Sequence, residues 1–303
     1  MKSVIPKTFV KIATLAVLVL FSGCSIVRLG YDHGPQLTWW WLDSYVDFDR
    51  TQKPHAKQAI RQWFDWHRIE QLPEYANWLS VVRSRISDPL TSEQVCGWSE
   101  KLQDIIAPAF DYAVQLSTPL ILSLGETQRR YLEKRYTKSN NKLRRKYLQP
   151  DPKDRLSAAI KRTVKRIENI YGVIDEKQRN LIIAGIETSP FNPEFWLFER
   201  QRRQQITLSI LQQLTKEPVS QEQAAVELRQ LVKHTYHSDD PNYRIYQKEM
   251  AEHTCDFIAR IHNTTTPTQR RHAHDKLKNW ETDLRALTGD SLLVDTQLFN
   301  ALE

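Results

Sequence analysis

The chain has 303 residues, a formal net charge of +7 and only 8 glycines. No run alternates apolar and polar residues for long enough to form a half-buried strand, and the segments between prolines are rich in the helix-favouring residues Gln, Glu, Arg, Leu and Ala. This composition excludes a sheet protein and predicts an all-α fold, with enough chain for one large domain or two small ones.

The N-terminal segment has the features of a targeting sequence. Lys2, Lys7 and Lys11 make its start positive, and Ile12–Phe21 is an apolar run interrupted by one threonine. That run is about half of the ~20 residues that a membrane-spanning helix needs. We therefore predict a cleaved signal peptide over residues 1–23, and we expect no later apolar run of spanning length.

The end of this segment resembles the lipobox of bacterial lipoproteins. Leu20-Phe21-Ser22-Gly23-Cys24 places small residues before the cysteine, although Phe21 is larger than the usual aliphatic residue. The resemblance implies cleavage before Cys24 and acylation of that residue, so that membrane lipid is a partner through the acyl chains. Ser25 replaces the aspartate that retains such proteins in the inner membrane, which favours the outer membrane. There we expect the protein to face the periplasm. The alternative is an ordinary secretory peptide with an incidental cysteine.

An aromatic cluster opens the predicted helical part of the chain. Trp39, Trp40 and Trp41 are consecutive, and three consecutive residues spread over about 200° of a helix. They cannot all face one core. One reading fills the core with these rings, and the other places Trp39 and Trp40 at the membrane interface close to the anchor. Asp43 and Asp47 share a helix face, where a solvated pair is a more ordinary outcome than a catalytic one.

We expect residues 24–38 to form a lipidated linker, 39–288 a helical domain and 289–303 a C-terminal tail. Capping boxes mark the predicted helix starts, because a Ser, Thr or Asp is followed three residues later by Gln. Prolines end the helical segments, which predicts an antiparallel multi-helix array. The starts lie in 90–94, 174–178, 219–223, a weaker 124–128, and 266–269 with its proline at the first helical position.

Two prolines and two cysteines bear on how the predicted helices are shaped and joined. Pro108 and Pro119 fall inside an apolar helical stretch and are expected to kink or divide it. Cys96 and Cys255 remain once Cys24 is assigned to lipidation. They form a disulfide in an oxidising periplasm or stay buried as free thiols, and their spacing does not decide between the two.

Positive charge concentrates between Arg129 and Arg166, where 15 Lys and Arg residues face three acidic ones. Apolar residues from Leu156 to Tyr171 recur at three- and four-residue steps, which predicts a helix with a buried stripe and a basic opposite face. Such a face attracts phosphates. For a periplasm-facing protein we expect an anionic envelope glycolipid or an envelope protein rather than nucleic acid; a solvated face without a ligand is the alternative. The candidate residues are Arg144, Arg145, Lys146, Lys161, Arg162, Lys165 and Arg166.

Signatures of catalysis and of metal binding are missing from the sequence. It contains no G-x-S-x-G, no glycine-rich phosphate loop and no H-E-x-x-H, so we predict a protein that is not an enzyme and uses no cofactor. His234 with His237, and His272 with His274, lack the spacing of a helical zinc pair, and no metal is expected. His67, between a tryptophan and an arginine, is expected to be a hydrogen-bonded core or boundary residue rather than a general base.

Several short motifs together suggest a family. They are Cys24-Ser25 with Arg28-Leu29 and Tyr31, Trp40-Trp41-Leu42-Asp43 with Tyr45, Trp66-His67-Arg68, Leu72-Pro73 with Tyr75, and the segments around Gln128 and Gln178. With these motifs the chain resembles a family of Gram-negative lipoproteins whose domain has no known function. The resemblance covers most of the mature chain and implies no chemistry.

These observations predict a lipid-anchored, non-enzymatic binding or scaffolding protein of the cell envelope. The Leu-Thr-x-x-Gln form of residues 90–94 is similar to a motif of small helical periplasmic stress chaperones, so a chaperone for unfolded clients is the alternative. A chaperone predicts a concave apolar surface. An enzyme of unknown reaction is the third possibility.

Overall fold

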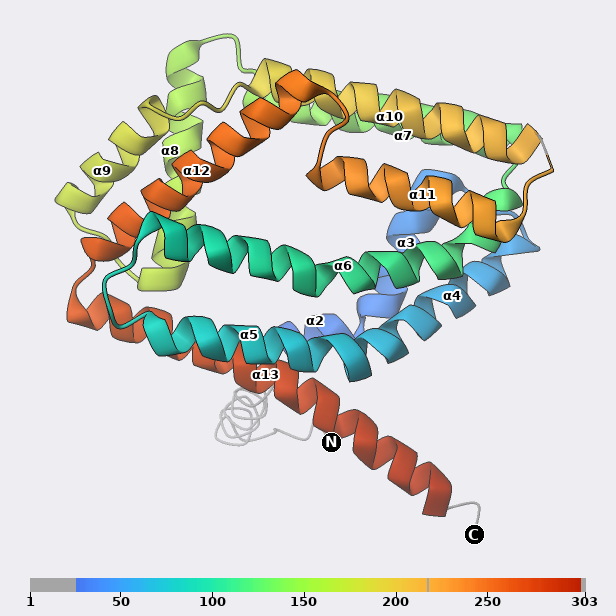
Figure 1. Cartoon of the computed structure of the whole chain (residues 1–303), viewed down its shortest axis with the longest axis horizontal. Coiled ribbons are helices and arrows are strands. Elements are labelled where there is room, and N and C mark those ends of the chain that lie inside the picture. Colours follow the sequence, from blue (N-terminus) through green and yellow to red (C-terminus); the bar gives the residue numbers. More distant parts are fainter. Residues whose placement is uncertain (1–25, 217, 301–303) are drawn as a thin grey trace, which may run out of the picture.

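The computed structural model describes the backbone of residues 26–216 and 218–300, and the side chains from residue 27 to 289 apart from residue 217. Helices and no strand occur in these ranges, which confirms the predicted all-α class (Figure 1). The predicted signal peptide over residues 1–23 and the predicted lipidation residue Cys24 lie outside the described residues.

Helices begin earlier in the chain than predicted. The expected linker 24–38 is wrong for its described part, because Ile26–Asp32 and Gly34–Val46 are helical. Helix α3 starts at Gly34 with a proline in its first turn, rather than at the tryptophans. The elements of the first half are α2 (Ile26–Asp32), α3 (Gly34–Val46), α4 (Gln52–Trp66), the π-helical turn η1 (His67–Gln71), α5 (Leu72–Arg85) and α6 (Ser92–Leu122).

The second half of the chain is equally helical. The predicted tail from residue 289 continues the last helix as far as Asn300. The elements are α7 (Glu126–Tyr147), α8 (Pro152–Tyr171), α9 (Glu176–Glu187), α10 (Pro193–Lys216), α11 (Gln221–Tyr236), α12 (Pro241–Asn263) and α13 (Pro267–Asn300).

The helices form a closed frame with α6 crossing it (Figure 1). The most extensive packing is between α5 and α13, which come from opposite ends of the chain. Next come α6 with α12, α6 with α11, and α7 with α10, so the main contacts join helices that are distant in sequence. Helix α13 also contacts α2, and the C-terminal part of the chain thereby closes the frame against its start.

The predicted capping boxes at 90–94, 174–178 and 219–223 are confirmed, each with both reciprocal hydrogen bonds. At 124–128 the Gln128 side chain accepts from the Gly125 N–H at 3.0 Å. These starts leave few first-turn N–H groups without a partner, which stabilises each helix end.

Helix α6 differs from the expectation for its prolines. It runs continuously from Ser92 to Leu122 with Pro108 and Pro119 inside it, so the prolines do not divide it. By length and composition α6 would also be able to span a membrane, contrary to the expectation that no later run would. In this fold it packs against α11 and α12 instead.

A disulfide joins α6 to α12. Cys96 and Cys255 are bonded, with an S–S distance of 2.04 Å and Cα atoms 5.4 Å apart. The bond lies in a core cluster that includes Val95, Ala259 and Leu277. Of the two alternatives left open by the sequence, the structure has the bridged one.

The amphipathic pattern of α8 is confirmed. Val164 and Tyr171 are buried, and Ile160 and Ile167 pack against buried residues of α9 and α12. The positive residues of the same helix lie on its remaining surface, and they bring charge to the site described next.

Candidate functional site

The structure separates the two tryptophans predicted for the membrane interface. Trp39 is 7% exposed and stacks on Phe48 with ring centroids 5.8 Å apart, so the interface prediction is wrong for Trp39. Trp40 is 60% exposed and stays available for such a role. The Nζ of Lys57 lies 4.9 Å from the Trp39 ring, which covers that ring from the solvent side.

The predicted basic surface divides into a cleft and an open face. Arg162 and Arg166 line a cleft, and Lys146 approaches its edge with its Nζ 5.3 Å from the Tyr147 ring. The remaining predicted residues are exposed and do not line the cleft: Arg144, Arg145, Lys161 and Lys165.

We name this site the α8–α12 cleft. It has a volume of about 600 Å³ and lies where α8, α9, α12 and the start of α10 meet. Its walls are aliphatic and aromatic, and its charged residues are arginines. The lining residues are Tyr147, Arg155, Leu156, Ala159, Arg162, Thr163, Arg166, Gly185, Ile186, Ser189, Phe191, Pro193, Trp196, Met250, His253, Thr254 and Phe257.

Three aromatic rings form one end of the cleft. Tyr147, the last residue of α7, has its ring centroid 5.4 Å from that of Trp196 and 6.2 Å from that of Phe191. Phe191 is 40% exposed at the surface, between α9 and α10. Edge-to-face contacts of this kind hold the rings in place, and the three rings add apolar surface to the cleft.

The opposite wall depends on a close approach between α9 and α12. A Cβ atom at Gly185 would lie 2.4 Å from Cδ2 of Phe257, so only glycine lets this ring pack on α9. His253 stacks on Phe257 with centroids 6.5 Å apart. The glycine thereby sets the depth of the cleft beside the arginines.

The arginines of the cleft have different partners. Arg155 is paired with Glu194 at 2.8 Å, while the guanidinium of Arg162 lies over the Tyr147 ring at 4.8 Å. Within the described part of the chain, no carboxylate lies within ion-pair distance of Arg162 or Arg166. Since no carboxylate lines the cleft, its electrostatic potential favours an anion.

This combination fits a ligand with two parts. Guanidinium groups bind phosphate and carboxylate oxygens through charge-assisted hydrogen bonds, and the aromatic and aliphatic walls bury an apolar chain. Among the described residues of the lining, the Ser189 and Thr254 hydroxyls are hydrogen-bonded to backbone groups and not to the His253 ring.

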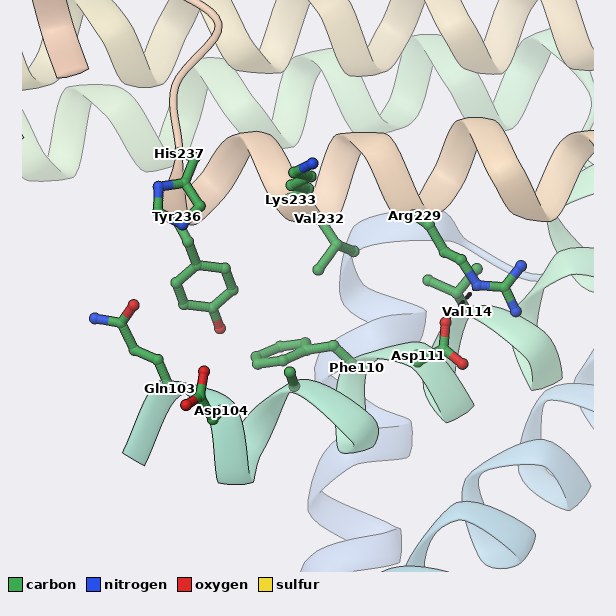
Figure 2. A pocket seen from close by; sticks show the side chains of 11 residues that line it. Gln103, Asp104, Phe110, Asp111, Val114, Arg229, Val232, Lys233, Tyr236 and His237 are labelled. Atoms are coloured by element: carbon green, nitrogen blue, oxygen red, sulfur yellow. Dashed lines mark hydrogen bonds and ion pairs between the residues drawn. The ribbon is translucent and has the colours of Figure 1, made fainter. Parts of the chain in front are cut away.

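A second, smaller pocket of about 260 Å³ lies between α6 and α11 (Figure 2). Phe110 and Tyr236 meet edge to face at 5.7 Å, and Arg229 forms an ion pair with Asp111 at one end. Asp104 adds a further carboxylate to the lining. Arg229 and Asp111 neutralise each other, and Asp104 and Lys233 add one charge of each sign, so the lining selects no class of ligand.

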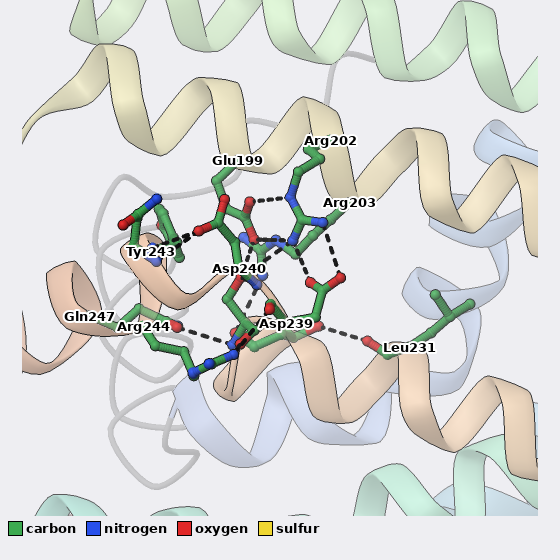
Figure 3. A network of polar contacts seen from close by, with 12 residues as sticks. Glu199, Arg202, Arg203, Leu231, Asp239, Asp240, Tyr243, Arg244 and Gln247 are labelled. Carbon is green, nitrogen blue, oxygen red and sulfur yellow. Dashed lines mark hydrogen bonds and ion pairs between the residues drawn. The ribbon is translucent and has the colours of Figure 1, made fainter.

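A buried polar network fixes the turn between α11 and α12 (Figure 3). Glu199 is 1% exposed and accepts from Arg202 at 2.6 Å and from the Ser238 hydroxyl at 2.7 Å. Hydrogen bonds to Glu199 and Asp239 raise the pKa of Arg202, and its guanidinium in turn lowers the pKa of Asp239. Arg202 is paired with both Glu199 and Asp239, so these three charges hold the turn that leads into α12.

His67 is a buried, hydrogen-bonded residue, as predicted. It begins the π-helical turn η1, its Nδ1 lies 3.0 Å from the Tyr31 hydroxyl, and its ring stacks on Trp63 at 4.4 Å. Burial lowers the pKa of His67 to about 4 and raises the pKa of Tyr31. These contacts account for His67 as a packed, hydrogen-bonded residue.

Several of the remaining polar candidates have structural partners. Asp43 accepts from the Phe48 N–H at 3.1 Å and closes the end of α3. His272 Nδ1 lies 2.8 Å from the Ile170 carbonyl oxygen, and Asp239 is bound to Arg202. Among the residues that the structure describes, no three His, Cys, Asp or Glu side chains gather as metal ligands.

Sequence reasoning missed most of the cleft wall. Phe191, Trp196, His253 and Phe257 were not singled out, because no spacing links the α9–α10 connection to α12. The available signal was the aromatic content of residues 191–198, which stands out in a charged helix start.

Comparison with known proteins gives one match. Residues 44–244 match a family of unknown function (DUF6279), which covers about two-thirds of the chain and the α7–α10 side of the cleft. No curated protein and no solved structure matches.

Proposed function

Since the chain belongs to the family of unknown function DUF6279, we propose a function from its site: a lipid-anchored, periplasm-facing, non-enzymatic protein that binds an anionic component of the cell envelope. The anchor is the acylated Cys24 of the lipobox-like segment, in the outer membrane. The binding site is the α8–α12 cleft, and the ligand is an anionic amphiphile such as an envelope glycolipid.

The observation that carries the binding proposal is the pair Arg162 and Arg166 in a cleft without a lining carboxylate. Their i, i+4 spacing places both guanidinium groups on one side of α8. The rings of Tyr147, Phe191 and Trp196 lie in the same cleft and supply apolar surface. A purely polar anion would leave those rings uncovered, and a neutral lipid would leave the two arginines unpaired.

The test is a titration with decyl phosphate kept below its micelle concentration, followed by tryptophan fluorescence and calorimetry. Arg162→Ala/Arg166→Ala removes both unpaired cations, and Lys161→Ala/Lys165→Ala removes the same charge from exposed positions of the same helix. We expect the first variant to bind roughly tenfold or more weakly, because two charge-assisted contacts are lost. The lysine variant should bind within about twofold of the parent, because it changes only the screened surface potential.

Equal weakening in both variants would mean that overall charge, and not the cleft, attracts the anion. Inorganic phosphate and decanol serve as separate probes of the two halves of the ligand. Binding of phosphate as tight as that of decyl phosphate would contradict the amphiphile.

A chaperone role is the second candidate, and one observation favours it. Helix α6 carries an apolar stretch of which only a small part is buried, and Phe110 on it is 39% exposed. A client-binding surface would lie along this helix. Suppression of aggregation of an unfolded client by the parent, and its loss in Phe110→Ser, would support this role; suppression unaffected by Phe110→Ser would count against it.

A further inference from the structure

Helix α3 carries an exposed apolar ridge, formed by Leu37, Trp40 and Trp41. These positions follow i, i+3 and i+4 spacing, so their side chains leave the helix on one side. They are 51%, 60% and 59% exposed, and Leu29 on the preceding helix α2 is 51% exposed. Contiguous exposed apolar surface of this kind marks a contact with a partner or a membrane.

The opposite side of α3 is used by the core. Trp39 packs with Phe48, Ala56 and Ile60 where α3 meets α4, and another flank of α3 contacts α7. In the described part of the chain, none of the hydrophobic core clusters includes a ridge residue. The ridge is therefore surplus to the fold, and its two tryptophans have an external role.

The ridge is held rigidly. The Trp41 ring contacts the Tyr45 ring at 5.1 Å, and the guanidinium of Arg135 on α7 lies over Tyr45 at 5.1 Å. Arg135 also donates to the Ser44 hydroxyl at 3.3 Å. These contacts fix the direction of the tryptophans relative to α7.

Helix α2 and the start of α3, which precede the ridge, are also fixed to the frame. In α2, Arg28 is paired with Asp283 of α13 at 3.2 Å, and the Tyr31 hydroxyl lies 3.0 Å from His67. Gly34 approaches Phe64 so closely that a Cβ would lie 2.5 Å from that ring. These contacts fix the position of α2 relative to α13, η1 and α4.

We propose that this ridge lies in the interface of the bilayer that holds Cys24, and that it sets the orientation of the frame on the membrane. The inference rests on the proposed anchor. Leu37 follows Cys24 by 13 residues, so even a fully extended chain would hold the ridge within about 45 Å of the anchor. Indole rings are favoured at the boundary between headgroups and acyl chains, and the ridge has no basic residue, so the contact is apolar rather than electrostatic.

The experiment uses the full chain, purified from membranes and reconstituted in vesicles of phosphatidylethanolamine and phosphatidylglycerol with or without brominated acyl chains. Bromine quenches tryptophans that reach the acyl chains. The variant is Trp40→Phe/Trp41→Phe, and the matched control is Trp98→Phe/Trp280→Phe, which also removes two of the nine tryptophans but from half-buried sites in the core. We expect the quenched fraction to fall roughly twofold in the ridge variant and to stay at the parent value, or rise, in the control.

Two results would overturn the inference, and they differ from each other. If all proteins float with the vesicles and the ridge variant is quenched as strongly as the parent, the anchor holds but the ridge faces away from the bilayer; a dimer in light scattering would then assign it to a second copy. If the parent does not float, the anchor itself is wrong, and the ridge inference fails with it.

Discussion

At the scale of single residues, two glutamine pairs join helix starts that are distant in the chain. The Gln178 amide donates to the Gln269 side-chain oxygen at 2.8 Å and accepts from its amide at 2.9 Å. Each of the two also accepts a backbone N–H at its own helix start, from Asp175 and Thr266. Gln52 and Gln128 pair in the same way between α4 and α7. A capping residue is thereby also a tertiary contact.

The Gln178–Gln269 pair predicts that truncation of one side chain lowers the free energy of unfolding substantially. Gln178 is 2% exposed, so Gln178→Ala would leave the Gln269 amide buried with lost partners and destabilise the fold by about 2–4 kcal/mol. Gln223→Ala is the control, since it removes an exposed capping residue and should cost about 1 kcal/mol. Urea unfolding measures both. Equal losses would show that the paired amides contribute no more than an ordinary cap.

His67 predicts a pH dependence of stability. Burial holds its pKa at about 4 in the folded chain, below the unfolded value of 6.5, so between these values the unfolded chain binds a proton that the folded chain does not. Stability is therefore full above pH 6.5 and falls as the pH drops towards 4. Between pH 6.5 and 4.5 the parent should lose about 2 kcal/mol more than His67→Gln.

The comparison for that prediction is His55→Gln, which replaces an exposed histidine on α4. Chemical unfolding at a series of pH values should give this variant the slope of the parent. A His67→Gln slope equal to that of the parent would contradict the assignment of the proton to His67.

At the scale of elements, the helix starts were the most readable part of the sequence. A capping box is local, because the residues at both ends of it are three apart, and the boxes at 90–94, 174–178 and 219–223 appear where they were predicted. The start of α3 was not predicted. Pro35 in its first turn is a local start signal, but His33 makes no side-chain cap, and the contact of Gly34 with Phe64 is a tertiary one that the sequence does not show.

The disulfide between α6 and α12 was left open for a similar reason. The cysteines are 159 residues apart, and only the packing of α6 on α12 brings them together. Reduction, or the change Cys96→Ser/Cys255→Ser, should destabilise the chain by roughly 4 kcal/mol, because the bond closes a very long loop in the unfolded state. Thermal unfolding with and without reductant measures this. If reductant also lowers the thermal stability of the double variant, the loss of stability in the parent has a cause other than this disulfide.

At the scale of the whole molecule, the sequence did not predict that the helices close into a frame. Loop lengths predict that consecutive helices are neighbours, yet the main packing joins α5 with α13 and α6 with α12. The α8–α12 cleft needs this closure, since its arginines come from α8 and Phe257 comes from α12. Local charge in the sequence predicted the basic residues. It did not predict the aromatic wall that forms a site together with them.

The central claim is that the cleft holds an anionic amphiphile in the cell. The most direct measurement is photocrosslinking in living cells with p-benzoylphenylalanine in place of Phe191, which is 40% exposed at the cleft. The control position is Phe198, which is 60% exposed on α10 and does not line the cleft. We expect an adduct with an anionic lipid or glycolipid at Phe191, lost in Arg162→Ala/Arg166→Ala, and none at Phe198. The same adducts at both positions, or no lipid adduct at Phe191, would contradict it.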